Sequence, residues 1–180
     1  MRIIARNWWP VVVWLGIIRV ESTGYASAQN TYLLLYRVLS FFYAQIDVRL
    51  VWELDHILRK SGHFIGYAIL SGLTFLALRN TCRDRVTGSS LRPWGQFFGD
   101  FWRLEWSSIA ILLTIVTASM DEIHQTFLPF RTGRWQDVLL DTSGAFLLQL
   151  IIYLACQLRF SFRGPGNFPP SRKLPLAEGD

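Results

Sequence analysis

Ionisable side chains gather in three short stretches of this 180-residue chain, each beside a long apolar run. The stretches hold Lys60 and His63, then Asp121, Glu122, His124 and Gln125, then Arg131, Arg134, Asp137 and Asp141. The set combines proton donors and acceptors with cations that bind phosphate or carboxylate through charge-assisted hydrogen bonds. Titratable groups gathered in a cleft are the usual mark of a reactive or binding site.

Helical spacing places several of these side chains on common faces. The sets are His63 with Tyr67, Asp121 with either His124 or Gln125, and Asp137 with Asp141. Asp141 lies a full turn inside an apolar run, where an ionisable group is costly and usually functional. In an enzyme, His63 or His124 would be the general acid or base, and a carboxylate would orient its ring.

The same residues allow two other interpretations. In an ion-pair network, Lys60 and Arg131 neutralise Asp121, Glu122 and Asp137, and so tie three helix ends together. Those three carboxylates could also hold a divalent metal, because hard cations favour carboxylate oxygens. No spacing demands a metal, so the cofactor stays unknown and no metal ligand is assigned.

The composition indicates what positions these groups. Hydrophobic residues make up 51% of the chain and charged residues 17%, against about a quarter charged in soluble domains. Long apolar runs alternate with short charged ones, which predicts an all-α membrane protein with four transmembrane helices. These spans cover residues 8–18, 63–78, 106–120 and 138–158. Residues 31–60 are predicted to form short amphipathic or re-entrant helices at the outer leaflet.

The ends of the chain raise separate questions. The first apolar run resembles a signal peptide, with Ala26, Ser27 and Ala28 as a small-residue cleavage site. Arg19 and Glu21 lie between the run and this triplet and favour a retained helix. Residues 1–160 then form one membrane domain. Residues 161–180, rich in Pro and Gly, are predicted to be a disordered cytoplasmic tail.

The distribution of charge predicts the topology. Eleven basic and five acidic residues lie before the first span, between the second and third, and after the fourth. The positive-inside rule places these segments, with both termini, on the cytoplasmic side of the inner membrane. This placement explains the net charge of +5 without a nucleic-acid partner. Cys82 and Cys156 fall on the same reducing side, so no disulfide is expected.

Two stretches resemble a known family. The sequence RKSGHFIGYAILSGLTF (59–75) is similar to a Lys-x-x-His-Phe-x-x-Tyr-x-x-Leu motif. The sequence DEIHQTFLPFRTGRWQDVLLDTSGAF (121–146) resembles Asp-Glu-x-x-Gln, then Pro-x-Arg, then Asp and a Gly-bearing helix. Together they resemble the VanZ-like family of small bacterial membrane proteins, over residues 59–158. Two positions depart from its pattern, Phe130 for a usual Gly and Asp141 for a common Asn.

The resemblance implies four membrane helices and an association with resistance to teicoplanin-type glycopeptides. It points to Lys60, His63, Tyr67, Asp121, Glu122, Gln125, Arg131 and Asp137. With the spacing arguments, the candidate catalytic residues are Lys60, His63, Asp121, Glu122, His124 and Asp137. The candidate ligand-binding residues are Tyr67, Gln125, Arg131, Arg134 and Asp141.

We therefore expect a multi-pass protein of the bacterial cell envelope with an outward-facing polar pocket. This pocket would bind or act on an anionic lipid-linked or cell-wall-related ligand, so the expected partner is a membrane lipid or lipid-linked component. One alternative is a non-catalytic protein that binds or shields the envelope. A proton-coupled carrier using Asp141 and His63 is less favoured, because four short spans without a repeat give little material for alternating access.

Overall fold

The computed structural model describes residues 2–22, 28–43, 45–87, 102–127 and 133–162. Within them the chain forms five α-helices and no strand: α1 (Arg2–Glu21), α2 (Ala28–Phe42), α3 (Val48–Thr87), α4 (Leu104–Thr126) and α5 (Trp135–Phe162). All except α2 contain a segment long and apolar enough to cross a membrane. The prediction of an all-α protein with four spans is confirmed.

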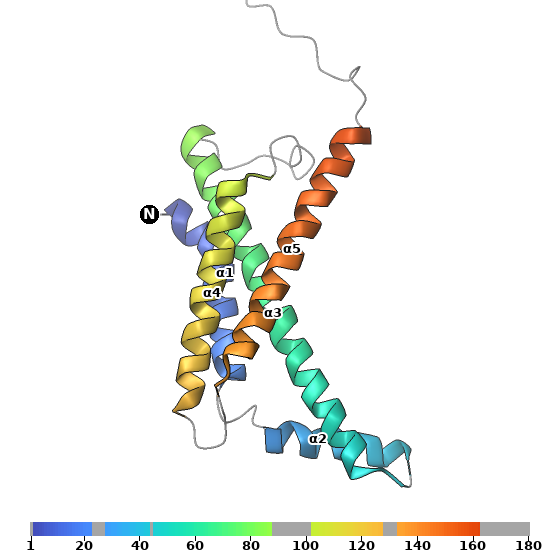
Figure 1. Ribbon diagram of the computed structural model, residues 1–180. Helices are drawn as coiled ribbons and strands as arrows, with labels where there is room; N and C mark the ends of the chain where they lie inside the picture. Colours follow the sequence, from blue (N-terminus) through green and yellow to red (C-terminus); the bar gives the residue numbers. More distant parts are fainter. Residues whose placement is uncertain (1, 23–27, 44, 88–101, 128–132, 163–180) are drawn as a thin grey trace, which may run out of the picture.

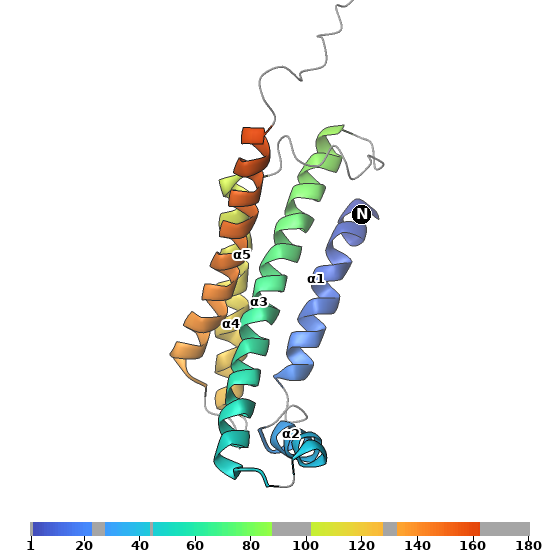
Figure 2. The same cartoon turned by 90° about the vertical axis from the view of Figure 1, so that its right-hand side faces the viewer.

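The four long helices lie side by side, and α2 lies across one end of the bundle (Figures 1 and 2). This end, where α1 and α4 finish and α5 begins, is called the site end below. The outer surfaces of the long helices carry exposed apolar side chains, among them Val12, Val20, Leu112, Met120 and Leu150. Such a surface suits lipid, because hydrocarbon rather than water is its favourable neighbour.

Helix α3 is the centre of the bundle and packs against every other helix. Its contact with α5 is the most extensive, and Gly144 makes it close, because a Cβ there would collide with the Phe64 carbonyl oxygen. Helix α1 is held on another side of α3, where the indole Nε1 of Trp14 donates to the Gly66 carbonyl at 2.8 Å. These contacts fix how α3 presents its remaining face to α4 and α5.

One helix joins two elements that the sequence suggested were distinct. Residues 48–60, expected in a helix at the membrane surface, are the first part of α3 and run into the span without a break. At about 1.5 Å per residue, its 40 residues extend roughly 60 Å, about twice the hydrocarbon thickness of ~30 Å. One part of α3 must therefore lie outside the hydrocarbon. Of the segment predicted to form amphipathic helices, residues 31–60, only α2 is a separate helix, and it packs against α3.

The other helices exceed the predicted spans at their ends. Helix α1 covers 20 residues, well beyond the apolar core of its run, because Arg2, Arg6, Arg19 and Glu21 join the helix. Helix α4 continues through the DEIHQT segment to Thr126. Helix α5 begins at Trp135 and ends at Phe162, so the predicted tail falls almost entirely outside the described residues.

Candidate functional site

The cationic wall of the site comes from one face of α3. Lys60 and His63 were predicted there, and His56 and Arg59 extend the same face at helical spacing. All four line one pocket at the site end. His56 was expected to be an interfacial residue at the membrane surface and Arg59 was not predicted as a site residue, although positions 56, 59, 60 and 63 follow the i, i+3, i+4, i+7 pattern of a single helix face.

The opposite wall is mainly acidic and comes from α4 and α5. Glu122 and Gln125 contribute from the end of α4, and Asp137, Leu140 and Asp141 from the first turns of α5. The pocket holds about 80 Å³, several times the ~10–15 Å³ that one water requires. It could therefore admit a small polar group of a ligand as well as water.

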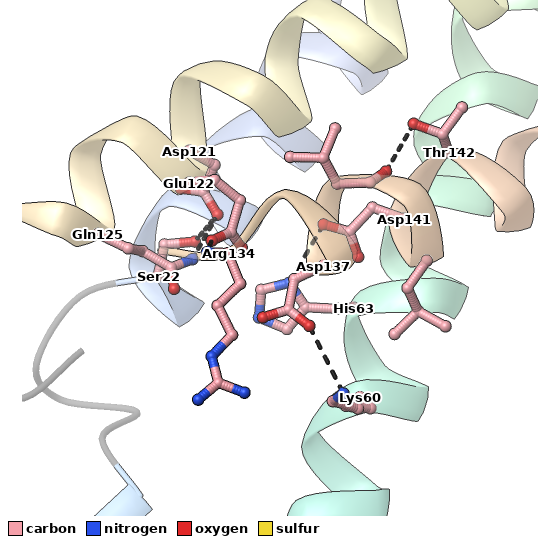
Figure 3. Close-up of polar contacts among 12 residues, drawn as sticks. Ser22, Lys60, His63, Asp121, Glu122, Gln125, Arg134, Asp137, Asp141 and Thr142 are labelled. Atoms are coloured by element: carbon pink, nitrogen blue, oxygen red, sulfur yellow. Dashed lines mark hydrogen bonds and ion pairs between the residues drawn. The ribbon is translucent and has the colours of Figure 1, made fainter. Parts of the chain in front are cut away.

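Two contacts between a basic and an acidic side chain connect the walls. Lys60 Nζ lies 3.6 Å from Asp137 Oδ1, and His63 Nδ1 lies 3.6 Å from Asp141 Oδ2 (Figure 3). The Lys60 pair is partly open to solvent, with side chains 47% and 27% exposed. Asp141 is only 1% exposed, and its two carboxylate oxygens have no hydrogen-bond partner among the described residues. Asp141 is therefore the least satisfied polar group of the pocket.

Glu122 is fixed by the segment that leads into α5. Its Oε2 accepts a hydrogen bond from the backbone N–H of Arg134 at 2.9 Å. Gly133 allows this approach, because a Cβ there would collide with the Glu122 carbonyl oxygen. In Figure 3 the Arg134 guanidinium extends away from the Glu122 carboxylate. Arg134 thus holds Glu122 through its backbone, while its charge stays available for another group.

Asp121 belongs to a neighbouring cluster. Its Oδ2 accepts hydrogen bonds from Ser22 Oγ at 2.5 Å and from Gln125 Nε2 at 3.0 Å. Arg19 Nη1 lies 3.9 Å from the other carboxylate oxygen. Gln125 also lines the polar pocket, so it connects the pocket to the end of α1. Asp121 itself does not line that pocket.

The remaining sequence candidates have separate places. Tyr67 lies in the apolar core at 1% exposure, and its hydroxyl has no hydrogen-bond partner in the described part of the chain. Its ring centroid lies 6.2 Å from that of His63. His124 lines a different hollow, between α1 and α4. Arg131 lies outside the described residues.

The carboxylates proposed for a metal have different partners. Asp121 accepts from Ser22 and Gln125, Glu122 accepts from Arg134, and Asp137 pairs with Lys60. In the described segments no group of three or more His, Cys, Asp or Glu side chains could hold a metal ion. These three carboxylates therefore do not form one donor set in the part of the chain that the structure describes.

The arrangement supports two kinds of chemistry. Arg59 and Lys60 offer donors to phosphate or carboxylate oxygens. His63, beside Asp141, has the geometry of a histidine oriented by a carboxylate. If Nδ1 carries the proton that faces Asp141, the basic lone pair lies on Nε2, where it could accept a proton from a ligand.

A family model described as VanZ/LLP1 matches residues 8–156. The match includes the whole pocket and most of all four long helices. No curated protein and no solved structure matches the chain.

Proposed function

Because the chain belongs to the VanZ/LLP1 family of membrane proteins, we propose that its polar pocket binds the anionic group of a lipid-linked component of the bacterial cell envelope. The pocket formed by His56, Arg59, Lys60 and His63 opposite Glu122, Asp137 and Asp141 carries this proposal. Arg59 and Lys60 would bind a phosphate or carboxylate. The acidic wall would accept hydrogen bonds from hydroxyl or amino groups of the same ligand.

The position of the pocket supports a lipid-linked ligand. It lies at the end of the bundle where α4 finishes and α5 begins, and there a headgroup can reach polar side chains while its tail stays in hydrocarbon. On this proposal the site end faces outward, and both termini lie on the cytoplasmic side of the inner membrane. This orientation follows from the excess of basic residues in the other connections and tails.

Proton transfer by His63 is the second part of the proposal. Asp141 is buried within 3.6 Å of the imidazole, so it can hold the ring and stabilise its protonated form. A pocket used only for binding would gain little from this pair, since Arg59 and Lys60 already supply the positive charge. A reaction at the bound headgroup would also account for the family's association with teicoplanin-type glycopeptides, through an altered envelope component.

Lipids that copurify with the protein provide the test. Lipid extracted from the purified protein, with and without divalent metal, should contain one enriched anionic species by mass spectrometry. The enrichment should be lost in Arg59→Gln and Lys60→Gln. Arg49→Gln is the matched control, because Arg49 lies on the same helix, pairs with a carboxylate and is 86% exposed outside the pocket.

A phenotype separates reaction from binding. Expression in a susceptible bacterium should raise the inhibitory concentration of teicoplanin, and His63→Gln should remove this effect while the anionic lipid still copurifies. Unchanged lipid content in Arg59→Gln and Lys60→Gln would show that the headgroup binds elsewhere. Full resistance in the His63→Gln variant would favour the alternative of a non-catalytic protein that binds or shields the envelope.

A further inference from the structure

A second hollow lies between α1 and α4, on the other side of Asp121 from the polar pocket. Helix α1 packs against α3, and α4 packs against α3 and α5. Helices α1 and α4 therefore share α3 as a neighbour. At the site end Ser22 and Arg19 reach across to Asp121. Between the two helices remains a groove of about 730 Å³, within the ~300–1,000 Å³ typical of small-molecule sites.

The walls of this groove are mainly apolar. They are formed by Leu15, Gly16 and Ile18 of α1 and by Met120, Ile123 and Phe127 of α4. The space beside Gly16 is open, because a Cβ at that position would meet no atom within 4 Å. Both helices are candidate membrane spans. An apolar hollow inside a membrane favours hydrocarbon over water, because water there would lack polar partners.

The polar lining of the groove includes Arg19, Asp121 and His124. Arg19 is 55% exposed. Its partner Asp121 already accepts hydrogen bonds from Ser22 and Gln125, and the Arg19 contact at 3.9 Å is long. A guanidinium has five N–H donors and binds phosphate in a bidentate manner. Arg19 can therefore keep its contact with Asp121 and still bind a phosphate at the membrane surface.

We infer that the groove between α1 and α4 binds one acyl chain of a membrane phospholipid whose anionic headgroup pairs with Arg19. Apolar walls inside two spans and a cation at their outer end match the two parts of such a molecule. This inference is independent of the ligand proposed for the polar pocket, since the two sites share only the Asp121–Gln125 hydrogen bond.

Native mass spectrometry of the purified full chain would test it, with phosphatidylglycerol and diacylglycerol of equal chain length as probes. Phosphatidylglycerol should be retained at an about tenfold lower concentration than diacylglycerol, which lacks the phosphate, and this is the difference expected for one hydrogen-bonded charge. Arg19→Gln should remove this preference. Arg49→Gln should keep it, because Arg49 lies outside the groove.

Filling the groove should prevent retention. Gly16→Phe projects a ring into it, whereas Gly62→Phe is the matched control, since Gly62 also has open space around its Cβ and lines neither hollow. If Gly16→Phe fails to accumulate, Met120→Trp fills the groove from α4 at a residue already 65% exposed. Equal retention of the two lipids by the unaltered protein would overturn the inference. So would retention that Lys60→Gln abolishes and both groove variants preserve, because the lipid would then occupy the polar pocket.

Discussion

His63 Nδ1 lies 3.6 Å from Asp141 Oδ2, and this pair joins α3 to α5 at the inner end of the polar pocket. The histidine is 21% exposed and the aspartate 1%. A carboxylate buried within a membrane span is costly unless a partner compensates it. The pair therefore has the character of a functional element.

Asp141→Asn should preserve folding and reduce function, because Asn, which is common at this position in the family pattern, can still hold the His63 ring but cannot stabilise its protonated form by charge. The substitution removes a buried charge that has no hydrogen-bond partner in the described part of the chain, while volume stays the same. We expect normal accumulation in the membrane and a partial loss of the teicoplanin resistance proposed above. Quantitative immunoblotting of membranes beside the inhibitory concentration would measure both. Loss of the protein together with the phenotype would instead indicate that the charge is structural.

The two histidines at the site end should not be equivalent. His63 lines the polar pocket and His124 lines the groove between α1 and α4. His63→Gln should therefore abolish the phenotype, and His124→Gln should leave at least half of the protection. The inhibitory concentration of teicoplanin at matched expression would compare them. Loss of resistance in His124→Gln but not in His63→Gln would place the proton-transfer step beside Asp121.

The hydrogen bond from Ser22 to Asp121 should contribute to stability. Ser22→Ala leaves a buried carboxylate oxygen with one donor fewer, at a cost of about 1–3 kcal/mol. Ser143→Ala is the control, because that exposed hydroxyl only bonds its own helix. Thermal unfolding in detergent should show a lower Tm for Ser22→Ala and an unchanged Tm for Ser143→Ala. Asp121→Asn should be milder, because its amide oxygen can still accept both hydrogen bonds.

The close contact of α3 and α5 predicts that replacing either of two glycines by alanine has opposite effects on the stability of the bundle. A Cβ at Gly144 would collide with the Phe64 carbonyl, so Gly144→Ala should destabilise the bundle by about 1–3 kcal/mol. Gly62→Ala should be neutral or stabilising by up to about 1 kcal/mol, because Ala is the better helix former and the space is open. Thermal unfolding of both variants decides the point. A stable Gly144→Ala would contradict the closeness of the two helices.

Single engineered cysteines should report the topology. In a background with Cys82 and Cys156 replaced by Ser, Thr132→Cys should react with a membrane-impermeant thiol reagent in intact cells and Ser90→Cys should not. Permeabilised cells provide the control, since both positions should then react. Labelling at position 90 but not at position 132 would show the opposite orientation, with the polar pocket on the cytoplasmic side. The intact mass of the same protein should show that α1 is retained, which its contacts through Arg6, Trp14 and Ser22 also favour.

The sequence alone determined the four spans, because long apolar runs have few alternatives to membrane helices. It also placed Lys60, Asp137, His63 and Asp141 at the same end of the bundle, since alternate helix ends meet on one side. The spacing argument for His56 and Arg59 was available in the sequence as well. His56 was interpreted as an interfacial residue and Arg59 was not predicted as a site residue, because their helix was expected to lie at the membrane surface rather than to form the first part of a continuous α3.

Only the tertiary structure decided which neighbours these residues have. Positions 121, 124 and 125 lie within one turn of helix, so periodicity left His124 and Gln125 as equal partners of Asp121. The rotation of α4 against α3 and α1 turned Gln125 to the pocket and His124 to the groove. Likewise, Gly62 and Gly66 lie four residues apart on α3, yet a Cβ at either position would meet no atom within 4 Å, whereas a Cβ at Gly144 of α5 would collide with the Phe64 carbonyl oxygen of α3. Helix periodicity defines the faces of each helix, but the faces that meet depend on packing among all four, which no single stretch of sequence contains.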